Sequence, residues 1–291
     1  MSLLAFALLL PASAQKKKFY AGDYLPREGD FALTVSANPF TSFVGNLFNN
    51  STSNELNSFG GSAYFSPILS ISGKYLLTDH LAVRANLGWS YSSARTKYYT
   101  QDDADLLINP FSQKQVIDEH ISRRAGGSFS VAAEYRIGNR RVQGIVGGGL
   151  VYAFSTNKER FLYGNGMTEI NQNPSSTGMA AEVNYRPYEM APAFSSQRYL
   201  TSFSSKPTHH FGPYAFVGVE WFICPWISLG GEVNVAAAWN WTGATYYESE
   251  GFNTISGKVE NWTQLRSPSS SGFEFGTGNF GANITVSFYF N

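Results

Sequence analysis

The chain ends in the stretch Phe280–Phe290, FGANITVSFYF, in which apolar and polar residues alternate. The apolar series is Ala282, Ile284, Val286, Phe288 and Phe290, and the polar series is Asn283, Thr285, Ser287, Tyr289 and Asn291. Successive side chains of a β-strand point to opposite faces, so this pattern predicts a strand with one apolar face and one polar face. The same period recurs upstream, notably along Leu81–Tyr91 and Ile227–Trp241.

Eight segments of this kind occur, and the connections between them alternate in length. The segments are about 30–39, 61–77, 80–98, 115–137, 142–157, 209–223, 227–246 and 272–291. Tight turns lie at 78–80, 138–140 and 224–226, whereas long polar stretches fill 40–60, 99–114, 158–208 and 247–271. Short turns at one end and long loops at the other are typical of outer-membrane barrels. We therefore expect an all-β fold, an eight-stranded antiparallel up-and-down transmembrane β-barrel, with 158–208 as its longest external loop.

The composition excludes several other classes of protein. The 21 basic residues balance 21 acidic residues, and charged residues make up only 14% of the chain. A nucleic-acid partner is not expected without a basic excess, and one cysteine cannot support a disulfide scaffold. The aromatic content of 16% argues against a disordered chain. A soluble barrel of the lipocalin type would need a more charged surface than this sequence provides.

The first fourteen residues are expected to be an export signal. Leu3–Leu10 is an apolar run, and it is followed by Pro11 and the small residues Ala12–Ala14. This order matches the apolar region and cleavage site of a secretory signal peptide. We therefore expect residues 1–14 to be removed and residues 15–291 to form a barrel domain in the bacterial cell outer membrane.

Aromatic residues are placed where the two interfaces of a membrane would meet such a barrel. Trp226 and Trp239 lie on one strand and would stand about 33 Å apart along the membrane normal, which suits two aromatic girdles. A transmembrane helix over 211–229 is disfavoured by Glu220 and by the turn at 224–226. Tyr75 and Phe222 are expected beside Trp221 in the inner girdle. The principal girdle residues are expected to be Trp89, Tyr91, Trp221, Trp226, Trp239 and Trp241.

If the apolar faces point to lipid, the polar faces place a layer of charge inside the barrel. The layer holds three cations and three anions, each within a few residues of a short turn: Lys74, Arg84, Glu134, Arg136, Glu220 and Glu232. Charges buried in so narrow a lumen are costly unless they are paired. We expect a salt-bridged plug that makes the protein a structural or interaction barrel displaying surface loops. The alternative is a small channel or transporter for ions or apolar solutes, with a cavity lined by residues such as Ile68 and Phe216.

Catalysis, a metal and a cofactor are not expected. Asp102, Asp103 and Asp105 could face His209 and His210 at the external rim, as in proteases of the omptin family, but those have ten strands. His120 could join the His209–His210 pair in a metal site, yet adjacent strand residues point to opposite faces. Cys224 has no second cysteine with which to pair. We therefore predict a protein that is not an enzyme.

Two stretches resemble known outer-membrane proteins. Phe280–Phe290 is similar to the closing strand of outer-membrane barrels, in which alternating terminal aromatics are read by the barrel-assembly machinery, although Asn291 follows the last aromatic here. Asp23–Phe31, DYLPREGDF, resembles the start of small outer-membrane proteins of Bacteroides-type bacteria, a group similar to OmpA-type barrels and porins. The resemblance implies outer-membrane lipid and the assembly machinery as partners, together with a partner protein in the same membrane.

Overall fold

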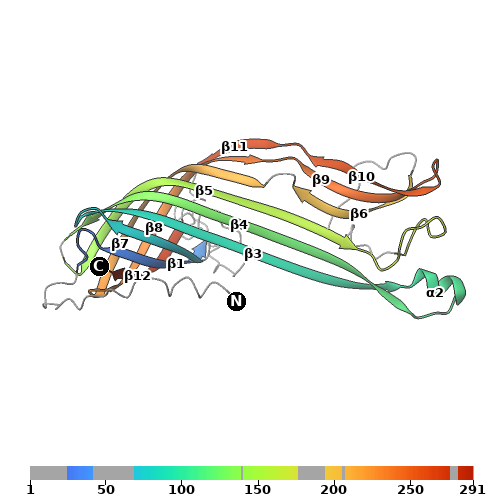
Figure 1. The fold of residues 1–291 in the computed structure, drawn as a ribbon, viewed down its shortest axis with the longest axis horizontal. Coiled ribbons are helices and arrows are strands. Elements are labelled where there is room, and N and C mark those ends of the chain that lie inside the picture. The colour runs from blue at the N-terminus through green and yellow to red at the C-terminus, as the bar shows by residue number, and fades with distance from the viewer. Residues whose placement is uncertain are drawn as a thin grey trace, which may run out of the picture.

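The computed structural model describes residues 25–41, 69–138, 140–175, 194–204, 207–275 and 281–290. The expected signal peptide and Ile68 lie outside these ranges. The strands within them form a single antiparallel sheet (Figure 1). No helix in this part of the chain combines the length and the apolar character needed to cross a membrane.

Eight strands of the sheet close into a ring. Each pairs with two neighbours, in the order β1-β2-β3-β4-β5-β7-β8-β12, and β12 pairs back to β1. The all-β antiparallel class is as expected, but the described sheet has twelve strands, of which the ring takes eight in a meander. Its strands are β1 (Phe31–Thr41), β2 (Leu69–Leu76), β3 (Leu81–Gln101), β4 (Gln115–Ile137), β5 (Val142–Leu162), β7 (Thr208–Cys224), β8 (Ile227–Thr242) and β12 (Gly281–Phe290).

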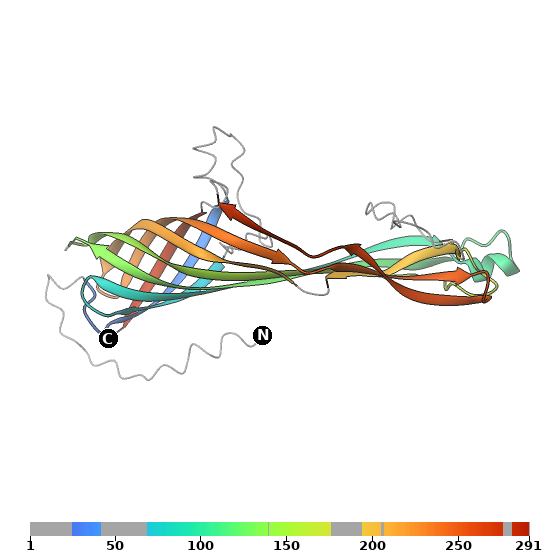
Figure 2. The ribbon, with the colours of Figure 1, turned by 90° about the horizontal axis from the view of Figure 1, so that it is seen from above.

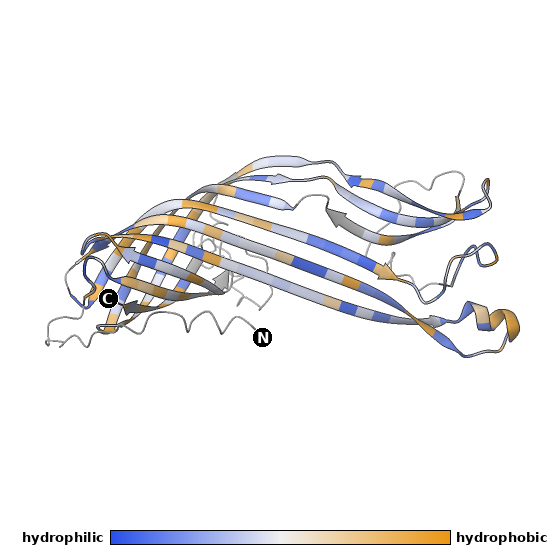
Figure 3. Ribbon diagram, viewed as in Figure 1, coloured by the Kyte–Doolittle hydropathy of each residue, from blue (hydrophilic) through white to orange (hydrophobic). Residues whose placement is uncertain are grey.

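The period-two pattern determines which side chains face out of the ring. Along β3, Leu87 and Trp89 face outward and are 63% and 66% exposed. Arg84, on the inward face of the same strand, is 6% exposed. In the ring portion of the described strands, the outward positions carry no Asp, Glu, Lys or Arg. Figure 3 shows apolar residues concentrated on the ring and hydrophilic residues more frequent on the long strands that lead away from it.

Three ring strands continue far beyond the ring, where they join strands that the sequence pattern did not predict. β3, β4 and β5 are followed across the sheet by β6 (Phe194–Ser204), β9 (Thr245–Asn253) and β10 (Lys258–Ser267). The connection between β3 and β4 contains the short helix α2 (Asp103–Ile108). We call this part of the sheet the extension. Figure 2 shows it leading away from the ring as a long, narrow sheet.

The sequence predicted long loops over 158–208 and 247–271. In their described parts these ranges instead contain the strands β6, β9 and β10. The segment expected at 272–291 is also two strands, because β11 (Ser270–Phe275) and β12 pair with different parts of β8. The extension strands escaped prediction because both of their faces carry polar residues. Lys258–Ser267, for example, shows no apolar series of period two.

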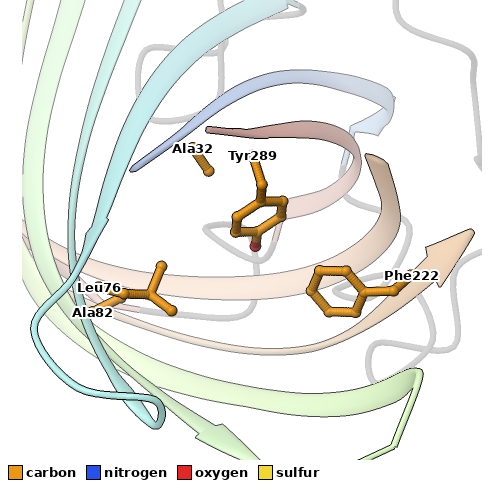
Figure 4. Packing of buried hydrophobic residues seen from close by; sticks show 5 residues of the cluster. All are labelled: Ala32, Leu76, Ala82, Phe222 and Tyr289. Atoms are coloured by element: carbon orange, nitrogen blue, oxygen red, sulfur yellow. The ribbon is translucent and has the colours of Figure 1, made fainter. Parts of the chain in front are cut away.

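The apolar core of the ring lies at the end where the short turns are found, which we call the turn end. Its members come from five different strands and point into the ring (Figure 4): Ala32, Leu76, Ala82, Phe222 and Tyr289. A second cluster, with Phe161, Tyr199 and Tyr247, lies in the extension. The core at the turn end positions the candidate site, because on β2, β3 and β7 a charged residue lies two positions from the core member.

Candidate functional site: the charged lumen

All six expected lumen charges face into the ring and are buried. Glu134 and Arg136 are 0% exposed, and Glu232, the most exposed of the six, reaches 8%. Their positions follow from the alternation of strand faces, because Lys74 and Arg84 each lie two residues from core members, Leu76 and Ala82. Register places Lys74 directly opposite Arg84. Like charges in direct opposition destabilise a sheet, so anions from other strands must lie between them.

Each of the three cations contacts two carboxylates. Lys74 Nζ lies 2.7 Å from Glu134 Oε1 and 3.5 Å from Glu220 Oε2. Arg84 Nη1 lies 2.7 Å from Glu232 Oε2 and 3.6 Å from Glu134 Oε2. The third cation joins the same carboxylates, since Arg136 lies 3.0 Å from Glu220 and 3.9 Å from Glu134. The six side chains therefore form one connected network with no net charge.

Neutral side chains that the sequence pattern did not assign complete the network. The Tyr289 hydroxyl accepts a hydrogen bond from Arg136 Nη1 at 3.0 Å and donates one to Glu220 Oε1 at 2.7 Å. Gln143 Oε1 accepts from Arg136 Nε at 2.8 Å, and the Ser228 hydroxyl donates to Glu220 at 2.6 Å. All three lie on the polar face of their strands, which is the signal that could have identified them.

An aromatic ring fills the lumen on the other side of Arg84. The Arg84 guanidinium carbon lies 3.8 Å from the centre of the Phe216 ring. Gly147 on β5 is opposite Phe216, and a Cβ at Gly147 would overlap that ring. The glycines of this strand therefore allow close packing across the lumen. Phe216 is 3% exposed and does not line an open apolar path.

A small polar pocket lies above the charge network, toward the extension. It has a volume of about 50 Å³, and its lining includes Arg84, Glu232, Asn86, Ser130 and Tyr214. Asn86 donates hydrogen bonds to the Ser130 hydroxyl at 2.7 Å and to the Tyr214 hydroxyl at 3.3 Å. A pocket of this size and polarity can hold a few water molecules.

The six expected girdle residues are at least 42% exposed: Trp89, Tyr91, Trp221, Trp226, Trp239 and Trp241. Five of them lie on the outward face of ring strands, whereas Trp226 lies in the turn between β7 and β8 and so corrects the expectation that it shares a strand with Trp239. Tyr75 is also exposed, at 49%. The expectation that Phe222 belongs to the inner girdle was wrong, because this side chain is fully buried in the core. Trp221 and Phe222 are adjacent on β7, so only one of them can face outward.

The histidines and acidic residues considered for catalysis or metal binding are not brought together. The pairing of β7, β5, β4 and β3 places His209 at the same height as Trp89. Asp102 follows Trp89 by 13 residues in an extended chain, so it lies about 40 Å from His209. His120 pairs with Phe161 of β5, and His210 pairs with Ala153 of the same strand. These two partners are eight residues apart, so the two histidines are separated by about 26 Å along the strand. Within the described ranges, no group of three or more His, Cys, Asp or Glu side chains is arranged to hold a metal ion.

The acidic residues instead organise the tip of the extension. Asp102 caps α2 by accepting hydrogen bonds from the backbone N–H groups of Ala104 and Asp105. Its carboxylate lies 2.8 Å from Lys114 Nζ, and this hydrogen bond lowers the pKa of Asp102 and raises that of Lys114. Asp103 accepts hydrogen bonds from Asn171 at 2.6 Å and from the backbone of Ser175 at 2.8 Å. These contacts hold two external connections together.

Acidification should loosen this tip. A lowered pKa means that the folded tip favours ionised Asp102, so the stabilisation is present above the ordinary carboxyl pKa and is lost as pH falls through the lower, folded value. We expect amide hydrogen exchange of α2 to accelerate over that acidic range in the wild-type protein, after correction for intrinsic exchange. The Asp102→Asn variant can still cap the helix but has no charge to lose, so it should lack this acceleration. Equal acceleration in both proteins would contradict the assignment.

Comparisons with known proteins give structural likenesses only. No protein-family model matches the chain. Among curated proteins, none matches either. The N-terminal β-barrel domain of OprF from Pseudomonas aeruginosa aligns at 11% identity and a TM-score of 0.37, covering 91% of this chain and 100% of that one. OprG from the same organism aligns at 9% identity and a TM-score of 0.37, covering 92% of this chain and 99% of that one. A major outer membrane protein from Thermus thermophilus aligns at 12% identity and a TM-score of 0.37, covering 90% of this chain and 99% of that one. These TM-scores are too low to assign the fold by similarity. The fold is assigned from the strand pairing of this chain.

Proposed function

We propose that the chain is an integral protein of the bacterial outer membrane, with a ring that spans the bilayer and an extension that stands outside the cell. The uncharged outward face of the ring supports this proposal. Along β3, the outward residues from Leu81 to Tyr91 span about 25 Å along the membrane normal, which matches the apolar band of outer-membrane barrels. A closed ring leaves no unpaired edge in hydrocarbon. Membrane lipid and, during insertion, the barrel-assembly machinery are its partners.

Within that setting we propose that the ring is a closed pedestal and that the protein acts as a structural or interaction barrel. The observation that supports this proposal is the connected network of buried charges inside the ring, with Phe216 packed against Arg84. The network leaves no net charge to attract ions. The displayed surface is a continuous sheet of six strands, rather than separate loops, and it offers a protein partner an ordered surface.

Conductance in planar lipid bilayers tests the closed pedestal. The wild-type protein should show no stable conductance steps at neutral pH, because the ion pairs block the lumen. The double variant Arg84→Ser/Glu232→Ser removes one cation and one anion, leaves the network neutral and enlarges the adjacent polar pocket, so it should conduct more than the wild type. Lys258→Ser, at an exposed position of β10 in the extension, is the matched surface control. Stable wild-type conductance large enough to pass sugars would contradict the pedestal.

A small channel is the second candidate, and the polar pocket beside Arg84 favours it. The pocket leaves polar space beside Arg84 and Glu232, and this candidate requires that a rearrangement of the network join that space to the turn end. This candidate predicts conductance steps in the wild-type protein that Arg84→Ser/Glu232→Ser alters in size. The same bilayer recordings therefore distinguish the two functions.

A further inference from the structure

Five cations gather on the outward face of β3, β4 and β5, just beyond the aromatic residues at the end of the ring opposite the turn end, which we call the loop end. We call them the basic patch: Arg95, Lys97, Arg123, Lys158 and Arg160. All five are exposed. One carboxylate, Glu119, lies among them, 3.7 Å from Arg95 and 3.8 Å from Lys97. The chain as a whole is formally neutral, so this excess of positive charge is local.

The basic patch is on the same face as the apolar wall of the ring. The pairing of β3 with β4 and of β4 with β5 runs from the ring into the extension without a register shift. The alternation of faces is therefore preserved, and Arg95 points to the same side as Trp89, while Lys158 points to the same side as Phe154.

The distance from the aromatic residues matches the position of lipid headgroups. Trp89 is paired with Gly127, and Arg123 lies four residues beyond Gly127 on β4. Lys158 likewise lies four residues beyond Phe154. Four residues of a tilted strand correspond to about 10 Å along the membrane normal. Aromatic residues mark the edge of the hydrocarbon region, and the polar headgroups occupy the layer immediately outside it.

The arrangement of the basic patch is unfavourable unless an anion lies against it. Arg123 and Lys158 are directly opposite each other in the register of β4 and β5. Like charges at such positions destabilise a sheet. Among the described residues, no hydrogen bond or ion pair engages the side chains of Arg123, Lys158 and Arg160, so no group in this part of the chain compensates these three charges.

We propose that the basic patch binds the phosphate groups of anionic lipids in the leaflet that surrounds the loop end of the ring. This inference rests on the proposed insertion of the ring in a membrane. Guanidinium groups match phosphate oxygens with paired hydrogen bonds. A lipid whose acyl chains lie along Leu87 and Leu150 would carry its phosphate to the height of Arg123 and Lys158. Fixed depth beside an apolar wall favours a lipid over a soluble anion.

Lipid binding measured by native mass spectrometry in a neutral detergent tests the proposal. The wild-type protein should bind phosphatidylglycerol more tightly than phosphatidylcholine. Each basic residue near an anionic membrane surface contributes about fivefold, so Arg123→Ser/Lys158→Ser/Arg160→Ser should weaken phosphatidylglycerol binding by about 100-fold. Arg124→Ser is the matched control, because Arg124 is adjacent in sequence, exposed and directed to the opposite face. It should change the binding by less than about twofold, since screening weakens its field across the sheet.

The outcomes separate this proposal from the proposed function. Wild-type protein and the triple variant are both reconstituted into phosphatidylcholine vesicles, and protection of the ring from protease is measured. Failure of the wild-type protein to insert would overturn both proposals. Insertion without a preference for phosphatidylglycerol, or a preference that survives in the triple variant, would overturn only the lipid site. Inorganic phosphate is the third probe, and its complete displacement of phosphatidylglycerol at equal concentration would assign the patch to a free anion instead.

Discussion

Replacement of Arg136 by Met should destabilise the ring by about 3–5 kcal/mol, because it removes one of three buried cations and leaves three buried carboxylates with only two. Arg136 is fully buried and contacts Glu134, Glu220, Tyr289 and Gln143. Methionine fills a similar volume but donates no hydrogen bond. Both carboxylates keep only part of their ion pairing, through Lys74 and Arg84. Urea-induced unfolding of the protein in lipid vesicles measures the loss.

The control for this variant is Arg124→Met, which makes the same chemical change at an exposed position of the same strand. We expect it to stay within about 0.5 kcal/mol of the wild-type stability. The double variant Arg136→Met/Glu220→Gln should recover part of the loss, because it removes a charge together with its partner. A loss below about 1 kcal/mol for Arg136→Met would mean that the network does not hold the ring together.

Replacement of Leu87 by Arg should destabilise the inserted protein by about 2–4 kcal/mol, the cost of a charge on the lipid face near the bilayer midplane. Leu87 is 63% exposed and lies near the middle of the apolar outward series of β3. The new side chain meets no partner on the outward face of neighbouring strands. Folding yield and urea stability in vesicles both report the effect.

The matched control is Leu265→Arg on β10. Leu265 is 52% exposed, nearly as exposed as Leu87, but it lies on the extension outside the ring. Its substitution should leave insertion unchanged. If both variants behave alike, or if Leu87→Arg is tolerated, the outward face of the ring does not face lipid.

The ring could be predicted from the sequence because each strand has one apolar and one polar face. Arg84 and Leu87, three residues apart, must point to opposite faces, and this alternation determined both the fold and the positions of all six lumen charges. In the structure these six side chains lie inside the ring and form ion pairs with one another. Tyr289 was placed on the polar face, but its two hydrogen bonds depend on how strands from opposite sides of the ring meet.

The extension could not be predicted in the same way, because its two faces do not differ in polarity. Val259 and Trp262 on β10 do not continue as an apolar series of period two, and β5 pairs with β6 through only a short register, from Lys158 to Arg160. The basic patch was missed for a related reason. Arg123 and Lys158 lie 35 residues apart in the sequence, and only the register of β4 and β5 places them opposite each other.

The most direct test of the account is the accessibility of methyl groups to a nitroxide carried on a lipid acyl chain. Methyl NMR spectra of the protein in lipid nanodiscs are recorded with and without the nitroxide lipid. The ring model predicts that the signals of Val83, Leu87 and Leu150 broaden strongly, because these side chains face outward, whereas those of the buried Leu76, Ile145 and Val151 broaden much less. Broadening of the buried set to the same degree, or no broadening of the outward set, would contradict a ring that spans the membrane with its charges inside.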